Sequence, residues 1–552
     1  MNTTNKISKF IENALIKAEK LNSLPKIKIQ KIIVEKPRNK DFGNWSSNIA
    51  MVLAKELKQN PMDIAQVISE NIEINDDIES IKIVKPGFIN FDLSEKFRSN
   101  LLNQILDEKK AFGSNFQGQD KKIQLEFVSV NPTGPVHVGH ARGAIVGSCI
   151  AKILSFSGYD VTKEYYVNDA GNQIHLYVES IKSKIYKKFG IPYPFPADGY
   201  KGKQIEEIST KIITKLYITK DNLEKIEDEK IKDESILITL DQIKKDLYDL
   251  GIEYDNWFFE SSLFKNDEIQ IVENILNDKN LIFEKDDAKW FKSSEFFTEN
   301  DVVIQRSKNE GHTYFLSDMA YHYNKFHIRH YENVINIFGA DHHSHVDRLK
   351  SAVKALDIDP EKLKILLTQI VHFKNQNKVE KFSKRSGNIY TVRDLIEIVG
   401  KDVCRFNFLN RSLDSQQEFD LELATQESSE NPVYYIQYAY ARLCSIINSF
   451  STEVDLKKVD LNLLRSEFEK DLIDNLDYFP QVVLDCAYKL QTQNLTQYSL
   501  DLAKELQKFY ENCRVISGDL ELTKARIILI SACKVVLKNT LDIMGISTPE
   551  RM

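Results

Sequence analysis

Cysteine is scarce in this chain of 552 residues: there are six, and no two of them form a Cys-x-x-Cys pair. This scarcity argues against a disulfide-built fold and against a zinc ribbon, and it fits a reducing compartment, so we expect a cytoplasmic protein. No apolar run reaches the roughly 18 residues that a membrane-spanning helix needs. The first twenty residues are polar and have no apolar core of the signal-peptide kind. We therefore expect no membrane association.

An excess of positive charge is also missing. The chain has 74 Lys and Arg against 81 Asp and Glu, which gives a formal net charge of −7. This balance argues weakly against a strongly basic nucleic-acid coat protein, although it leaves room for a local cationic groove. The 42% hydrophobic content is typical of a folded chain, and the length predicts several domains of about 150 residues each.

The hydrophobic periodicity predicts three parts. Residues 1–112 alternate helical and strand patterns, which predicts a small α/β domain. Residues 113–405 show a strand, a long helix and a second strand in succession, which is typical of a Rossmann-type doubly wound parallel sheet. Within this part, residues from about 175 to 290 are charged and helical and predict an insertion. Residues 406–552 are helical almost throughout, so we expect an all-helical C-terminal domain.

Histidine is absent from the first 136 residues and from the last 180. The strongest motif, His137-Val138-Gly139-His140, follows a predicted strand and begins a predicted helix. Two imidazoles three residues apart share one face of the first helical turn, where free N–H groups favour phosphate oxygens. Gly139 would let a flat ring such as adenine approach the backbone. These features predict a nucleotide site.

A second motif, Lys381-Phe382-Ser383-Lys384-Arg385-Ser386-Gly387-Asn388, places two lysines three residues apart before a small residue and a glycine. Alone, this pattern fits a solvated surface loop at least as well as a cationic site. Its position, 241 residues after His140, is far enough to come from another strand of the same sheet.

Together the two motifs resemble the HIGH and KMSKS pair of class I aminoacyl-tRNA synthetases. The stretches EFVSVNPTGPVHVGHARGA, NDAGNQI, NPVYYIQYAYAR and GISTPERM narrow the resemblance to arginyl-tRNA synthetases of the bacterial type. The resemblance implies ATP-dependent ligation of arginine to its tRNA through an arginyl-adenylate, with release of AMP and pyrophosphate. It also implies ATP as substrate with Mg²⁺, a tRNA-binding N-terminal domain and an anticodon-binding C-terminal domain.

The resemblance also implies site residues. Those expected to contact ATP are His137, Gly139, His140, Asp341, His342, Lys381, Ser383 and Lys384. Of these, His137, His140, Lys381 and Lys384 are the expected catalytic residues. The expected arginine contacts are Glu126, Asn131, Tyr314 and Asp318. Paired carboxylates suit a guanidinium because its fork of donors needs paired acceptors.

Two further features are weaker. Asp169, Gly171 and Gln173 resemble a family loop at the edge of the sheet. His342, His343 and His345 could suggest a metal cluster, but no Cys-x-x-Cys accompanies them and we expect no protein-bound metal site.

Contacts to tRNA are expected from the C-terminal part, by resemblance. An aromatic helix there fits core packing or base stacking about equally well. The residues concerned are Tyr434, Gln437, Tyr438, Arg442, Arg526 and Met552.

Three other functions fit parts of the sequence. A small nucleotidyltransferase shares the His-x-Gly-His signature but is usually short and lacks a long helical C-terminal domain. An inactive synthetase-like RNA-binding protein would be expected to have lost His137, His140 or Lys384, and all three are present. A ligase for cysteine would carry zinc-ligand cysteines, which are missing. We expect a monomer.

Overall fold

The computed structural model describes residues 2–27, 31–37, 39–307, 311–375, 378–380, 391–451 and 458–552. It divides into two compact units. One contains Met1–Asn115, Glu427–Leu490 and Asn494–Met552, and the other contains Phe116–Gln426 and Gln491–Gln493. In the described part of the chain, no helix is both long and apolar enough to cross a membrane.

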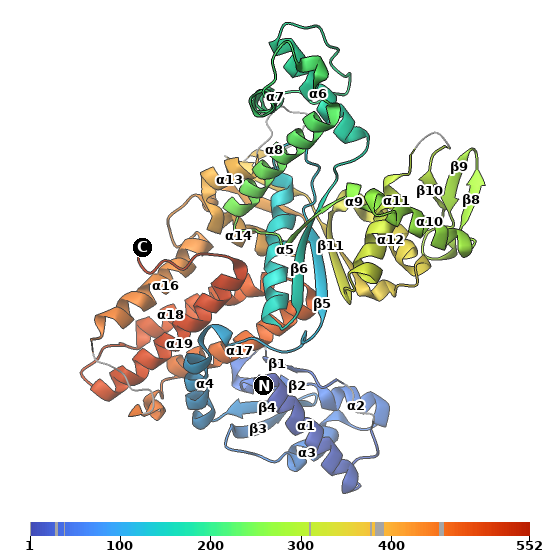
Figure 1. Cartoon of the computed structure of the whole chain (residues 1–552). Coiled ribbons are helices and arrows are strands. Elements are labelled where there is room, and N and C mark those ends of the chain that lie inside the picture. Colours follow the sequence, from blue (N-terminus) through green and yellow to red (C-terminus); the bar gives the residue numbers. More distant parts are fainter. Residues whose placement is uncertain are drawn as a thin grey trace. The chain divides into compact units, whose positions relative to one another are not determined.

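The centre of the second unit is a parallel sheet of five strands (Figure 1). Every neighbouring pair runs parallel, in the order β12-β11-β5-β6-β7. Helix α5 (Val138–Phe156) makes the crossover from β5 to β6. This topology confirms the doubly wound sheet expected from the sequence. The strands are β5 (Lys122–Phe127), β6 (Asp160–Val167), β7 (Asn256–Phe259), β11 (Asn333–Gly339) and β12 (Leu363–Thr368).

The strand order reverses between β5 and β11. From β5 the chain adds β6 and β7 on one side, and it later adds β12 beyond β11 on the other. In such sheets, ligands bind outside the carboxyl ends of the strands at this switch point. The fold therefore predicts a site formed by the residues that follow β5 and β11 and their neighbours.

Helix α5 packs closely on the sheet because Gly147 has no side chain. A Cβ atom there would lie 2.5 Å from the ring of Phe127 on β5. The helix is also held by the buried guanidinium of Arg142. It donates hydrogen bonds to the backbone oxygens of Ser415 at 2.7 Å and Ser412 at 2.6 Å. The start of α5 is thus fixed at the carboxyl edge of the sheet.

The segment from about 175 to 290 differs in its second half from the helical insertion that its charge pattern suggests. Its first half is helical, with α6 (Asn172–Lys188), α7 (Lys203–Lys215) and α8 (Asp228–Asp249), and α6 and α7 pack together (Figure 1). Then β7 joins the central sheet as an edge strand. A strand of four residues between charged helices is too short for its periodicity to be recognised.

A second sheet and several helices follow β7. Strands β8, β9 and β10 form an antiparallel sheet, and α11 continues into a π-helical turn, η5 (Asn324–Ile328). The elements are α9 (Ser261–Lys265), α10 (Glu268–Asp278), β8 (Ile282–Lys285), β9 (Ala288–Phe291), β10 (Val302–Gln305), α11 (Tyr314–Tyr323) and α12 (His343–Ala355).

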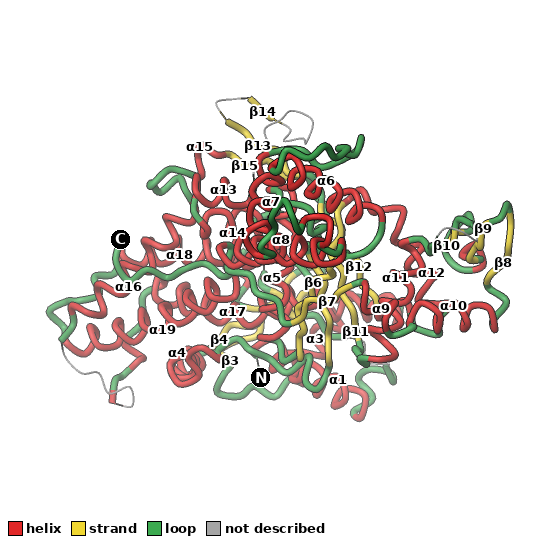
Figure 2. Tube along the Cα trace, turned by 45° about the horizontal axis from the view of Figure 1, so that its top comes forward, coloured by secondary structure: helices red, strands yellow, loops and turns green. Residues whose placement is uncertain are grey.

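The unit closes with a three-stranded sheet in the order β14-β13-β15 and three helices (Figure 2). These elements are β13 (Val371–Asn375), β14 (Lys378–Glu380), α13 (Val392–Val399), α14 (Lys401–Leu409), β15 (Gln417–Asp420) and α15 (Leu421–Ala424).

The first unit joins the N-terminal α/β part to the C-terminal helices. Its antiparallel sheet has the order β1-β2-β4-β3. The N-terminal elements are α1 (Thr3–Lys20), β1 (Val34–Glu35), β2 (Trp45–Ser47), α2 (Ile49–Leu57), α3 (Pro61–Asn71), β3 (Ile78–Val84), β4 (Phe88–Leu93) and α4 (Glu95–Glu108). The C-terminal helices are α16 (Pro432–Ser449), α17 (Glu467–Lys489), α18 (Gln493–Asn512) and α19 (Leu520–Met544).

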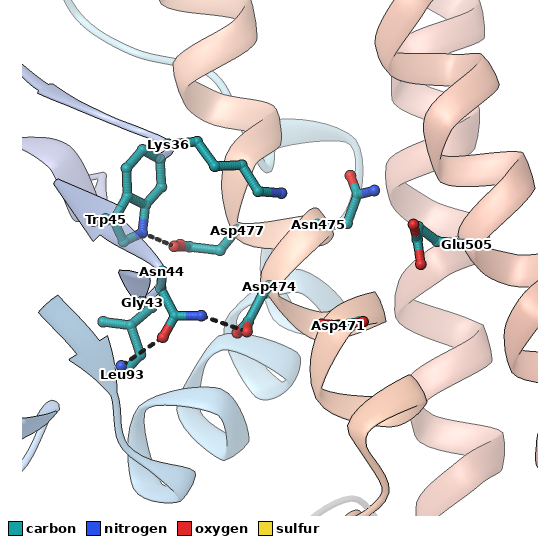
Figure 3. Close-up of a pocket in the computed structure, with 10 residues that line it drawn as sticks. All are labelled: Lys36, Gly43, Asn44, Trp45, Leu93, Asp471, Asp474, Asn475, Asp477 and Glu505. Carbon is teal, nitrogen blue, oxygen red and sulfur yellow. Dashed lines mark hydrogen bonds between the residues drawn. The ribbon is translucent and has the colours of Figure 1, made fainter. Parts of the chain in front are cut away.

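Within this unit, two aspartates of α17 connect the C-terminal helices to the N-terminal part by hydrogen bonds and an ion pair. The Asp477 carboxylate accepts a hydrogen bond from the Trp45 indole at 2.9 Å (Figure 3). Asp474 pairs with Arg98 at 2.9 Å. Asn44 also donates to Asp474. Burial raises the pKa of Asp477 to about 6. Segments more than 370 residues apart in the sequence therefore share one polar core.

Candidate active site

Polar residues gather where the five parallel strands end. Glu126 is the penultimate residue of β5, and Asp169 follows β6 by two positions. Glu260 directly follows β7, and Asp341 follows β11 by two positions. Because parallel strands end at one edge of the sheet, the topology brings the residues of four separate segments to that edge.

His137 is the N-cap of α5. Its Nδ1 accepts a hydrogen bond from the Gly139 N–H at 3.0 Å. A neutral His137 ring therefore carries its proton on Nε2 and presents it as a donor. The His140 ring is exposed and lies 6.4 Å from that of His137, nearly perpendicular to it. At the positive end of the α5 helix dipole, these rings form a set of donors suited to phosphate oxygens.

Tyr314 and Asp318 lie one turn apart on α11, as their spacing predicts. The Asp318 Oδ2 atom is 2.8 Å from His345 Nε2. Tyr314 approaches Gly171 closely, since a Cβ atom on that glycine would lie 2.9 Å from the tyrosine hydroxyl. Gly171 also has a φ of +82°, a conformation that favours glycine. The loop after β6 and helix α11 thus meet at one place.

Glu260 is a buried carboxyl group that the sequence patterns did not single out. Its pKa is raised to about 7, mainly by burial and also by the nearby charges of Asp318 and Asp169, while a hydrogen bond from Ser317 opposes the change. The same three carboxylates, after burial, raise the pKa of Tyr166. A cluster of carboxylates with this concentration of negative charge favours a cationic ligand. The one feature of the sequence that could have pointed to Glu260 is its position directly after β7. That strand has only four residues, too few for its periodicity to be recognised.

Glu126 is already paired. Its Oε2 accepts from the fully buried Lys325 ammonium at 2.7 Å, and its Oε1 accepts from Ser129 at 3.1 Å. Asn131, the other predicted contact from this segment, donates to Gln173 at 2.5 Å. This bond joins the loop after β5 to α6.

The remaining predicted residues are placed as follows. Asp341 and His342 are exposed in a short turn (Ala340–His342) after β11. Among the described residues, no group of three or more His, Cys, Asp or Glu side chains is arranged to hold a metal ion. Lys381, Ser383 and Lys384 lie outside the described residues.

Family models match three consecutive parts of the chain. "Arginyl tRNA synthetase N terminal domain" matches residues 5–93, "tRNA synthetases class I (R), catalytic domain" matches residues 101–406, and "DALR anticodon binding domain" matches residues 436–552. The arginine–tRNA ligase of Caldanaerobacter subterraneus subsp. tengcongensis is 42% identical over 554 residues, which cover 99% of this chain and 98% of that protein. The chain belongs to the arginyl-tRNA synthetase family.

Another relative agrees with this membership, and a solved structure matches the fold. The arginine–tRNA ligase of Acetivibrio thermocellus is 40% identical over 558 residues, covering 99% of this synthetase and 98% of the relative. The crystal structure of Thermus thermophilus arginyl-tRNA synthetase matches the fold with a TM-score of 0.76 at 21% identity, covering all of both chains.

The residues expected to contact tRNA differ in their surroundings in this synthetase. Tyr438 is 49% exposed and Met552 is 52% exposed. Arg442 stacks over the Tyr510 ring at 4.3 Å and donates to Gln507. Arg526 instead pairs with the buried Glu469 at 2.7 Å.

Two expected contacts on α16 are partly buried. Tyr434 is half-buried, and Gln437 donates to the Ser547 backbone oxygen at 3.0 Å. Among the six expected tRNA contacts, Arg526 has the geometry that most favours a structural role, because its charge is used within the unit.

Proposed function

We propose that this chain ligates L-arginine to its tRNA with ATP, through an arginyl-adenylate, and releases AMP and pyrophosphate. One observation carries the proposal: a helix N-terminus that bears two histidines and a cluster of interacting carboxylates lie at the same edge of one parallel sheet. The first suits the phosphates of ATP and the second suits a guanidinium. Membership of the arginyl-tRNA synthetase family gives the reaction that uses both.

In the first step, the arginine carboxylate attacks the α-phosphorus of ATP. This nucleophile is already ionised, so no protein base is needed, and catalysis consists of positioning and stabilisation of charge. His137 Nε2–H, His140 and the positive end of the α5 helix dipole would hold the phosphate oxygens. Lys381 and Lys384 would add positive charge to the leaving pyrophosphate.

Mg²⁺ would accompany the triphosphate. The described residues offer no complete set of metal ligands, and Asp341 offers one exposed carboxylate near the site. This fits Mg²⁺, which usually binds through one or two carboxylates together with substrate phosphates. The ion would neutralise charge on the pyrophosphate oxygens.

Arginine recognition would rest on Asp318, Glu260 and Tyr314 for the side chain. The pKa of Glu260 is raised to about 7, and a guanidinium bound beside it would favour the ionised form of its carboxylate. A neutral analogue would leave these acceptors without donors, above all the buried Glu260, which costs far more than a change of size. Glu126 and Asn131 would contact the substrate amine and backbone.

The tRNA would bind through the first unit and the loop at residues 381–388. We keep the division into an appended domain (1–112), a catalytic domain (113–405) and an anticodon-binding domain (406–552). Tyr438, Gln437, Arg442 and Tyr434 would face RNA bases, where aromatic faces and guanidinium planes stack. We also propose that the protein acts as a monomer in the cytoplasm.

The test is aminoacylation of arginine tRNA transcripts with each amino acid in turn, with ATP and Mg²⁺ present. Charging with arginine alone supports the proposal. Charging with another amino acid and none with arginine would refute it.

A further inference from the structure

Asp318 is held by two histidines, one at its backbone and one at its carboxylate. His322 Nδ1 lies 2.8 Å from the Asp318 backbone oxygen, one helical turn back on α11. His345 Nε2, from the first turn of α12, lies 2.8 Å from the Asp318 Oδ2 atom. Neither the histidine-rich stretch around His345 nor its position on α12 assigns it a role. Its contact with Asp318 does.

The proton of His322 can be placed from its partners. A backbone oxygen only accepts, so Nδ1 of His322 carries the hydrogen. Its Nε2 then accepts from Asn336 Nδ2 at 2.9 Å, and the Asn336 oxygen accepts from the Lys325 ammonium at 3.1 Å. Burial lowers the pKa of His322 well below its usual value, so this ring is neutral. The backbone of Asp318 is therefore anchored to β11 by a chain of assigned hydrogen bonds.

His345 is held in orientation by aromatic neighbours. Its ring meets Phe315 of α11 edge-on at 5.8 Å and lies 6.4 Å from Phe338 of β11. An ionised carboxylate only accepts, so His345 Nε2 carries the hydrogen and donates it. The contact uses Oδ2 of Asp318, while no side chain in the described part of the chain donates to Oδ1, which can accept from a ligand.

This bond matters because Asp318 stands among like charges. Its charge interacts with that of Glu260, on which Asp169 also acts, and both aspartates contribute to the raised pKa of Glu260. Without the His345 donor on Oδ2, the Asp318 side chain would rotate away from the Glu260 carboxylate and so reduce this repulsion. We infer that His345 is a positioning residue that holds the Asp318 carboxylate toward the guanidinium of arginine, an inference that rests on the proposed function.

The test compares two variants in aminoacylation of arginine tRNA by the full chain. His345→Phe keeps a ring against Phe315 and Phe338 but removes the donor. His345→Gln keeps an N–H donor within reach of Asp318. His343→Gln, on an exposed residue of the same helical turn, is the matched control.

We expect His345→Phe to raise the KM for arginine roughly tenfold, because it removes a hydrogen bond to a charged group, while the KM for ATP and kcat change less than about threefold. His345→Gln should restore the arginine KM to within about threefold of the wild type. The control should behave as the wild type.

An unchanged arginine KM in His345→Phe would overturn the inference, and so would His345→Gln if it raised that KM as much as His345→Phe does. If His345→Phe fails to fold, His345→Asn replaces it, because its shorter amide cannot reach Asp318. A wild-type chain that charges no arginine would instead refute the proposed function, so the two failures are distinguishable.

Discussion

The ammonium of Lys325 and the carboxylate of Glu126 form an ion pair of 2.7 Å beneath the carboxyl edge of the sheet, with the lysine side chain wholly buried. Lys325 comes from the π-helical turn after α11, and Glu126 comes from β5. Its ammonium also lies 4.0 Å from the centre of the Tyr321 ring. Burial lowers the Lys325 pKa, and the Glu126 charge is the first of the groups that oppose this change. The ion pair therefore fixes Glu126, a predicted arginine contact, through Lys325, which no sequence motif had indicated.

Removal of one partner should be costly. Lys325→Met leaves the Glu126 charge buried without a partner, and it should lower the free energy of unfolding by about 3 kcal/mol. The double variant Lys325→Met with Glu126→Gln should regain part of that loss, because no buried charge remains. Urea unfolding of the two single variants, the double variant and the wild type measures the coupling. Additive losses would show that the two side chains do not stabilise each other.

Arginine affinity should depend on pH through Glu260. Its pKa of about 7 lies above the ordinary value for a glutamate, so the free enzyme binds a proton there as the pH falls through 7. A guanidinium favours the ionised carboxylate, so binding must release that proton. Affinity for arginine should therefore weaken as the pH falls below about 7 and level off above it.

Calorimetric titration with arginine in two buffers of different ionisation enthalpy counts the released proton directly. Glu260→Gln should bind arginine more weakly, and its affinity should lose this pH dependence. A wild-type proton release that persists unchanged in Glu260→Gln would assign the proton to another group.

Adenylate formation should depend on His140 more than tRNA binding does. His140→Ala removes a ring from the first turn of α5, and it should slow adenylate formation by about 100-fold through the lost charge stabilisation. The affinity for tRNA should stay within about threefold of the wild type, since we propose that the ring contacts the phosphates of ATP. Pyrophosphate exchange in the presence of tRNA measures the first effect, and filter binding measures the second. A large loss of tRNA affinity would contradict this division of roles.

Asp477 should make stability depend on pH. Its folded pKa of about 6 lies above the ordinary 3.8, so folding takes up a proton between these values. Stability should fall as the pH rises through this window, by about 3 kcal/mol at most, and stay level above it. In Asp477→Asn, this part of the pH dependence should disappear. Urea unfolding between about pH 4 and pH 7 tests it, and equal slopes in both proteins would contradict the assignment.

The sequence predicted most of what local pattern determines. The strand before His137, the helix that begins at Val138 and the one-turn spacing of Tyr314 and Asp318 all follow from short-range periodicity and helix geometry. The family resemblance supplied the functional reading of these residues, and family membership is confirmed. The expected doubly wound sheet and helical C-terminal part are confirmed as well.

Other features depend on contacts between distant segments and had no local signal. Glu260 follows a strand of only four residues, and Lys325 reaches Glu126 across 199 positions. Asp477 accepts from Trp45 across 432 positions, so the shared core of the N-terminal part and the C-terminal helices could not be read from composition. The individual site roles remain predictions.

The most direct measurement of the central claim is ATP-dependent charging of arginine tRNA by the wild-type chain, with each amino acid supplied separately. The account predicts charging with arginine and none with lysine or citrulline, and it predicts that Asp318→Asn raises the KM for arginine far more than the KM for ATP. Charging with another amino acid in place of arginine, or equal changes in both KM values for Asp318→Asn, would contradict it.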